Sequence, residues 1–216
     1  MSRIDPLQTE LLPVPDGPSP WPDASLLRLL HPGLGVIGFT GDVGVLVLGG
    51  YLAAWFLSRG QRVIVVDGSD SCDLYRIKDI ARRLGRRPGT FFKRLSVARG
   101  RNCHDIDRLI TQKVLDAART HQASTVILSG VLEAFYDERV PESEARRLVA
   151  WMAKAVRAMA ADIPLVVLLC PEPPPARRDF ASLFTAAADR LYRVATEAGS
   201  SPVRLQISPT GAHGFE

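Results

Sequence analysis

Two kinds of apolar segment alternate along the chain: short runs rich in valine, isoleucine and leucine, and longer stretches whose apolar residues recur at helical spacing. Short apolar runs of this kind are typical of buried strands, and their alternation with helices is typical of a mostly parallel sheet. The pattern therefore predicts an α/β fold, a mostly parallel sheet flanked by helices. We expect strands at 36–40, 62–67, 94–98, 125–129, 165–170 and 203–207, and helices at about 43–58, 73–85, 105–121, 142–161 and 178–198.

The helices expected at 43–58 and 142–161 differ in character. The later one begins after Pro141 with acids in its first turn, where they suit the exposed amides, and its apolar residues recur at three and four. The earlier one has no charged residue between Val43 and Leu57, which predicts a core helix buried on nearly all sides. That run is short for a membrane span, and a strand follows it at once.

The expected elements leave both ends of the chain outside one central domain. Residues 1–25 are predicted to form a Pro-rich N-terminal arm, 26–207 the α/β domain, and 208–216 a C-terminal tail. The arm contains no long apolar stretch, so no secretory signal is expected. Cys72, Cys103 and Cys170 are odd in number and widely spaced, which disfavours a disulfide framework or a zinc site and indicates a reducing cytoplasm.

Positive charge is concentrated in one part of the chain. The net charge is +4, but the stretch from Arg76 to Arg101 holds ten basic residues against one acid, Asp79. Such a block indicates a polyanionic or acidic partner, although cations at a helix C-terminus also complement its dipole. The expected contacts to DNA or an acidic partner are Arg82, Arg83, Arg86, Arg87, Lys93, Arg94, Arg99 and Arg101, with Arg177 and Arg178 from a later loop.

The turn after the first expected strand has the layout of a phosphate-binding loop. Residues 39–46 occupy the eight positions of G-x-x-x-x-G-K-[ST], but only Gly44 matches a defining residue. Val45 and Leu46 stand where the motif has its phosphate-binding lysine and its magnesium-binding hydroxyl. The candidate nucleotide-binding residues of this turn, in a degenerate site, are Thr40, Gly41, Asp42, Val43, Gly44, Val45 and Leu46. Asp67 is a further candidate, and the family resemblance described below adds Ser69 and Ser129.

A dinucleotide-binding site is a second interpretation of the same region. Gly33, Gly35 and Gly38 spell G-x-G-x-x-G, and Asp67 ends the second expected strand. These glycines, however, lie before and inside the first strand, whereas the dinucleotide motif follows it. An NAD-dependent enzyme also needs an acid–base pair, which the sequence does not offer. Cys103-His104-Asp105 is interpreted as the start of a helix.

The wider pattern resembles the RecA/RadA/Rad51 superfamily of P-loop ATPases over roughly residues 26–207. The resemblance lies in Gly38-Phe-Thr-Gly-Asp-Val-Gly44, in Val63-Ile-Val-Val-Asp-Gly68, in the segment 73–85, and in Thr125-Val-Ile-Leu-Ser-Gly with the segment up to 138. It implies that Val45 replaces the P-loop lysine, Leu46 the magnesium-binding hydroxyl and Ser129 the acid that ends a later strand. The glutamate that activates water falls near Ser69, with Asp70 one place along.

The resemblance implies a pseudo-ATPase, because phosphoryl transfer depends on the groups that these positions lack. We expect no catalysis, no metal, and ATP binding that is weak or absent. In this family, loops after two later core strands hold single-stranded DNA. The corresponding loops here are 131–141, which is acidic, and 171–178, whose only cations are Arg177 and Arg178.

The function expected from the resemblance is that of an accessory protein in DNA recombination, repair or damage tolerance. Its expected partners are DNA, with single-stranded DNA favoured, and a RecA-like or other repair protein. The sequence allows homo- or hetero-oligomers, and no membrane contact is expected. The alternative is a protein-interaction module that regulates an active ATPase without touching DNA.

Overall fold

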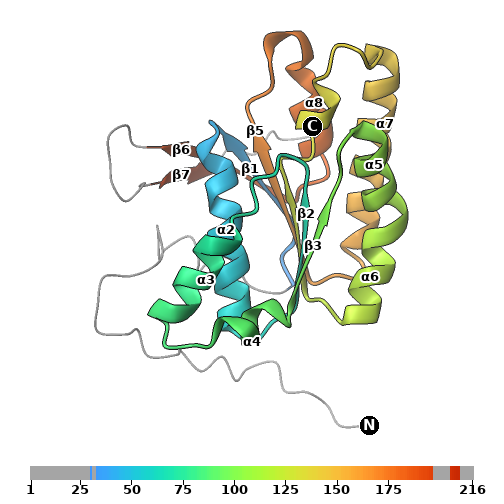
Figure 1. Ribbon diagram of the computed structural model, residues 1–216. Coiled ribbons are helices and arrows are strands. Elements are labelled where there is room, and N and C mark those ends of the chain that lie inside the picture. Colours follow the sequence, from blue (N-terminus) through green and yellow to red (C-terminus); the bar gives the residue numbers. More distant parts are fainter. Residues whose placement is uncertain (1–29, 31–32, 197–204, 210–216) are drawn as a thin grey trace.

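The computed structural model describes residue 30, residues 33–196 and residues 205–209 (Figure 1). Its strands form one sheet in the order β3-β2-β4-β5-β1-β6-β7; β1 to β6 run parallel, and β7 is antiparallel to β6. This arrangement confirms the predicted α/β fold. The strands are β1 (Gly35–Gly41), β2 (Val63–Asp67), β3 (Leu95–Arg99), β4 (Thr125–Ser129), β5 (Leu165–Pro171), β6 (Arg190–Thr196) and β7 (Leu205–Pro209).

Helices cover both faces of the sheet (Figure 1). On one face lie α2 (Gly44–Ser58), α3 (Leu74–Arg83) and α4 (Pro88–Phe92); on the other lie α5 (Cys103–Arg108), α6 (Val114–His121), α7 (Glu142–Met159) and α8 (Asp179–Thr185). A π-helical turn, Leu109–Lys113, joins α5 to α6. Among the described residues, no helix combines the length and apolar character that crossing a membrane requires.

The strands supply two cores because successive side chains of a strand point to opposite faces. In β5, Val166 and Leu168 pack with α5 to α8, whereas Val167 and Leu169 pack with α2 and its neighbours. Both faces of the central strands are therefore buried, and all residues of β2, β4 and β5 are inaccessible to solvent. This double burial explains why these strands are continuous apolar runs without polar alternation.

Helix α2 is buried on its sheet face and half-buried on its outer face, so the prediction of burial on nearly all sides holds only in part. Leu48 and Leu52 are inaccessible, whereas Tyr51 and Trp55 are half-buried under the guanidinium groups of Arg76 and Arg59. Gly49 and Gly50 in the middle of α2 allow the sheet and α3 to approach the helix closely on two sides. A Cβ at position 49 would lie 3.0 Å from the side chain of Leu169 in the sheet, and one at position 50 would lie 3.5 Å from the side chain of Arg76.

The predicted helix at 178–198 is wrong in its second half. Helix α8 ends at Thr185, and residues 190–196 form β6, which pairs with β1. The carboxylate of Asp189 accepts a hydrogen bond from the amide of Val36 (2.8 Å), which attaches the start of β6 to β1. The apolar residues up to 187 recur at helical spacing, which is why the sequence predicts a helix there. Residues 190–196 form a strand because they pair with β1, which is distant in sequence.

Three other boundaries differ from the predictions. The short helix α4 was not expected, although Pro88 at its start is a typical helix-initiating residue. The helix expected from 105 begins at Cys103, because the Asn102 side chain accepts a hydrogen bond from the amide of Asp105 (2.9 Å). Strand β7 extends to Pro209, so the predicted tail at 208–216 begins two residues inside it. The predicted arm, 1–25, lies outside the described residues.

Candidate functional site

The turn 39–46 lies where β1 ends and α2 begins, and groups of the chain itself bond to the amides at the start of the helix. The Asp42 carboxylate accepts a hydrogen bond from the amide of Gly44 (2.7 Å). The amides of Val45 and Leu46 are bonded to the carbonyls of Asp42 and Val43, at 3.0 and 3.2 Å. In a phosphate-binding loop, amides at a helix start point at the ligand. Here all three are bonded within the turn.

At the two positions that the resemblance assigns to the P-loop lysine and hydroxyl, Val45 is buried and Leu46 is half-buried. Val45 is inaccessible and belongs to the core between α2 and the sheet. Leu46 extends toward Gly130, directly after β4, where its terminal carbon lies 3.2 Å from the position a Cβ would take. Thr40 is half-buried at the end of β1, and the Val43 side chain is 76% exposed. The end of β4 is thus covered by an apolar side chain.

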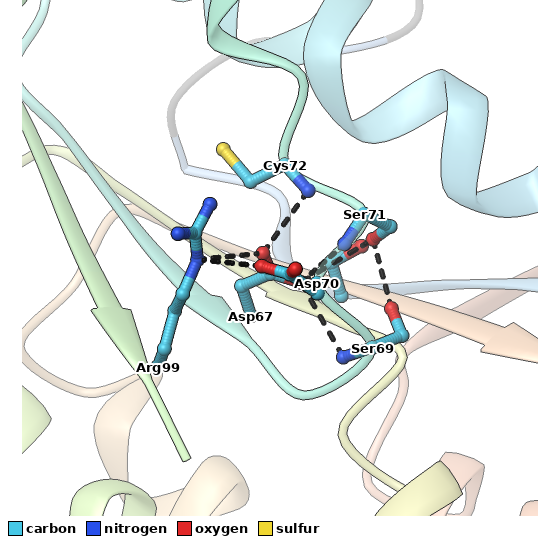
Figure 2. A network of polar contacts seen from close by, with 7 residues as sticks. Asp67, Ser69, Asp70, Ser71, Cys72 and Arg99 are labelled. Carbon is cyan, nitrogen blue, oxygen red and sulfur yellow. Dashed lines mark hydrogen bonds and ion pairs between the residues drawn. The ribbon is translucent and has the colours of Figure 1, made fainter. Parts of the chain in front are cut away.

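Asp67, at the end of β2, is the centre of a polar network (Figure 2). Its carboxylate is inaccessible to solvent and accepts hydrogen bonds from the amides of Ser71 and Cys72, both at 3.0 Å. The amide of Ser69 and the guanidinium of Arg99 lie farther away, each at 3.4 Å. Asp67 therefore organises the loop 68–72, and its burial leaves no oxygen open to the ribose of a dinucleotide.

Serine hydroxyls connect this loop to β4. Ser69 Oγ donates to Ser71 Oγ at 2.8 Å (Figure 2). Ser71 Oγ in turn lies 3.1 Å from Ser129 Oγ. The structure thus brings together Asp67, Ser69 and Ser129, which the sequence analysis had grouped. Ser71, which joins all three, was missed, because a serine in a turn carries no distinguishing sequence signal.

Asp70 stands beside the position of the water-activating glutamate implied by the resemblance. Its side chain is 82% exposed and pairs with Arg99 at 3.1 Å. Its φ of +53° is an uncommon backbone conformation, although aspartate tolerates it better than most residues. An exposed, paired carboxylate with no buried phosphate site beside it is poorly placed to activate a water.

The cysteines are protonated at neutral pH. Burial, with a smaller contribution from the Asp67 carboxylate, raises the pKa of the Cys72 thiol to about 11, against an opposing effect of Arg99. Burial alone raises the pKa of Cys170 to about 12, and it is the largest cause that raises the pKa of Cys103. Because the thiolate is the nucleophile, none of the three is poised for covalent chemistry. Within the described residues, no group of histidine, cysteine, aspartate or glutamate side chains could hold a metal ion.

The predicted DNA-contacting set is not one surface. Arg83 pairs with Asp79 at 2.8 Å, and Arg99 pairs with Asp67 and Asp70 at the carboxyl edge of the sheet, the edge where β1 to β5 end. Arg94 precedes β3 and Arg99 is its last residue, so about 16 Å separates their backbones at about 3.3 Å per residue. Arg101 follows β3 at the carboxyl edge, and Arg178 precedes α8; both are exposed.

Arg177 is a correction to that set, because its side chain is buried and used internally. It is 7% exposed, and its guanidinium donates to the carbonyls of Phe135 (3.0 Å) and Val140 (2.7 Å), with Asp137 O at 3.3 Å. The guanidinium also lies over the ring of Phe180. Arg177 holds the loop 131–141 in place and cannot contact a phosphate without breaking these bonds.

The segments that carry the remaining cations, the end of α3, the residues after it and those before β3, lie near α4 at the opposite edge of the sheet (Figure 1). Helix α3 runs away from the carboxyl edge, so the residues after it and those before β3 meet at the amino end of β3. We call this region the amino-edge basic surface; it consists of Arg82, Arg86, Arg87, Lys93 and Arg94. None of these five has a carboxylate partner within 4 Å among the described residues.

Comparison with known proteins adds no identification. No protein-family model matches the chain, and a search of curated proteins finds no significant match.

Proposed function

We propose that the protein is a non-hydrolysing, RecA-like accessory protein of DNA recombination, repair or damage tolerance, and that it binds DNA through the amino-edge basic surface. The observation that carries the proposal is that the five cations of this surface, which follow one another closely in the sequence, have no carboxylate within 4 Å among the described residues. The one acid between Arg76 and Arg101, Asp79, pairs with Arg83 instead. Cations without internal partners are available to neutralise the phosphates of an external polyanion.

The loss of hydrolysis is supported by the turn after β1. A phosphate at the start of α2 would compete with the Asp42 carboxylate for the Gly44 amide and would meet its negative charge. Val45 and Leu46 supply no cation or metal ligand, and Ser129 supplies no carboxylate. Phosphoryl transfer relies on such groups to stabilise charge in the transition state.

We expect calorimetric titration with ATP and Mg²⁺ to show no binding in the micromolar range. The physical reason is that the amides of this turn are bonded internally and that Asp42 repels a phosphate. An Asp42→Asn variant tests the charge separately, and we expect it to gain no tight binding, because Val45 and Leu46 still lack phosphate-binding groups. Micromolar affinity in the unmodified protein would refute the assignment.

Neutralising the amino-edge basic surface is expected to weaken binding of single-stranded DNA. For the triple variant Arg82→Gln, Arg86→Gln, Arg87→Gln we expect about 100-fold weaker binding at 0.1 M salt. The slope of log K against log salt concentration should fall by about 2, since each phosphate contact to single strands contributes about 0.7. Fluorescence anisotropy at several salt concentrations measures both quantities.

A matched variant removes the same charge from another part of the surface. Lys113, Arg147 and Lys154 are exposed on the α5–α7 side, and their replacement with glutamine should leave the salt slope nearly unchanged. An equal loss in both variants would mean that only net charge matters. Undetectable DNA binding by the unmodified protein at low salt would contradict the DNA-binding part of the proposal.

Exposed aromatic side chains favour the alternative, a protein-interaction module that acts on an ATPase partner. The side chains of Tyr75 on α3 and Trp151 on α7 are 83% and 64% exposed. Aromatic residues are enriched in protein interfaces. A change in a partner's ATPase rate without any DNA binding would support this alternative.

A further inference from the structure

A small hollow opens between the amino ends of β2 and β3 and the C-terminal residue of α6. Its volume is about 240 Å³, and its lining includes Arg62, Lys93, Arg94, Ser96 and His121, with Ile64 and Ala123 as apolar parts. Arg62 and His121 lie outside the basic block that the sequence shows, so only the fold brings them to Lys93 and Arg94. The hollow lies at the opposite edge of the sheet from the turn 39–46.

The charge of the hollow is of one sign. None of its lining residues is acidic, and three of them, Arg62, Lys93 and Arg94, carry a permanent positive charge at neutral pH. Within the part of the chain that the structure describes, none of the three has a carboxylate within 4 Å, and neither has His121. Convergent cations without a counterion repel one another, and an anion in the hollow would relieve that repulsion.

Backbone bonds hold the two arginines in place. Arg62 Nη1 donates to the carbonyl of His121 at 2.8 Å, and Arg94 Nε donates to the carbonyl of Thr90 at 3.1 Å. Their own backbones are fixed by neighbouring strands, since Arg94 O accepts from Val63 N (2.9 Å) and Arg62 O accepts from Ser124 N (3.1 Å). Each guanidinium keeps further N–H groups for a ligand, and a positioned arginine loses less entropy when it binds an anion.

We propose that this hollow binds a terminal phosphate group, and that its ligand is the phosphorylated end of a DNA strand lying on the amino-edge basic surface. The hollow is smaller than the ~300–1,000 Å³ of pockets for drug-sized ligands, so it suits a phosphate with little else. The phosphates inside a DNA strand belong to a backbone that continues in both directions, so they fit the open surface formed by the exposed arginines after α3 better than a small hollow. A terminal phosphate ends there and carries about −1.5 to −2 charge, which matches three convergent cations.

The phosphate site and the surface form one path, because Lys93 and Arg94 belong to both. The identification of the ligand as a DNA end therefore rests on the proposed function. Binding of a phosphate group in the hollow does not, since it follows from the lining alone. The two parts are tested separately below.

The test compares short oligothymidylates that carry either a phosphate at one end, 5′ or 3′, or hydroxyls at both ends, bound to the full chain and followed by anisotropy. We expect the unmodified protein to bind the phosphorylated strand roughly tenfold more tightly, about the effect of one charge-assisted hydrogen bond. Arg62→Gln should abolish this preference with little effect on the unphosphorylated strand. Arg82→Gln, outside the hollow, should weaken both strands by the same factor.

Titration with inorganic phosphate tests the hollow without DNA. We expect it to shift the imidazole resonances of His121 in the NMR spectrum of the unmodified protein but not of Arg62→Gln. Lys93→Gln provides a second variant, because the exposed Lys93 side chain has no hydrogen bond or ion pair in the described structure and its loss should not affect folding.

The outcomes separate the two parts of the proposal. Equal affinity for both strands together with unchanged His121 resonances would overturn it entirely. A phosphate-dependent shift with equal strand affinities would support the phosphate site and overturn the DNA end as its ligand. A phosphate-dependent shift without binding of either strand would support the site and overturn the proposed function.

Discussion

Replacing Gly41 with alanine is expected to remove about 3–5 kcal/mol from the free energy of unfolding, the sum of a backbone clash and conformational strain. Gly41 ends β1, and β6 passes directly beside it in parallel register with Val194. A Cβ at this position would lie 1.9 Å from the Val194 carbonyl oxygen and 2.9 Å from its carbon. These atoms are backbone, so no side-chain rotation relieves the clash, and β1 and β6 must separate.

In urea denaturation, we expect the variant to unfold at a lower urea concentration, while the dependence of the unfolding free energy on urea concentration stays unchanged. Gly89→Ala is the matched control, because Gly89 lies in α4 with open space around its Cβ position. There alanine should be neutral or stabilise by up to about 1 kcal/mol through helix propensity. A Gly41→Ala protein as stable as the original would mean that β6 does not lie against the end of β1. The placement of β6 would then be wrong.

An Asp67→Ala variant is expected to lose about 3 kcal/mol of unfolding free energy. The substitution removes the acceptor of the Ser71 and Cys72 amides, both at 3.0 Å, and leaves Arg99 with the exposed Asp70 as its remaining partner. Each buried donor left without an acceptor costs about 1–3 kcal/mol. The loop 68–72 should loosen first, so amide hydrogen exchange at Ser71 and Cys72 should accelerate more than exchange in β2.

Asp79→Ala is the control for charge, since Asp79 forms an exposed i,i+4 pair with Arg83. Such pairs contribute about 0.3–0.5 kcal/mol, so little change is expected. Asp67→Asn retains one acceptor oxygen and should lie between the alanine variant and the unmodified protein. If Asp67→Ala were as stable as Asp79→Ala, the network in Figure 2 would not be what organises this loop.

Both expected effects concern the carboxyl edge, where the resemblance places a nucleotide site. That edge is occupied by the protein's own groups: Asp42 accepts from the amide of Gly44, Leu46 lies against Gly130, and Asp67 accepts from the loop amides. The unpaired cations of the amino-edge basic surface lie at the other end of the sheet. In the proposed function, the carboxyl edge is retained for stability, and ligand binding takes place at the amino edge.

Local patterns were sufficient for the parts of the fold that are local. Continuous apolar runs predicted β2, β4 and β5, because strands buried on both faces are mostly apolar between their ends. The spacing of apolar residues predicted α7, and the absence of charge in 43–57 predicted the core position of α2. The grouping of Ser69 and Ser129 with Asp67 came from the resemblance to P-loop ATPases, and the structure places all three at one edge of the sheet, where parallel strands end.

By itself, the sequence determined the class of fold, the central strands and the lack of a lysine and a hydroxyl at positions 45 and 46, because each depends on residue type and short-range periodicity. Only the tertiary structure decided which cations have carboxylate partners. It divided one continuous basic stretch between two edges of the sheet, buried Arg177, and brought Arg62 and His121 to Lys93 and Arg94. It also made a strand of 190–196. The physical reason is that ion pairs, strand pairing and hollows depend on distances between residues far apart in sequence, which local periodicity does not encode.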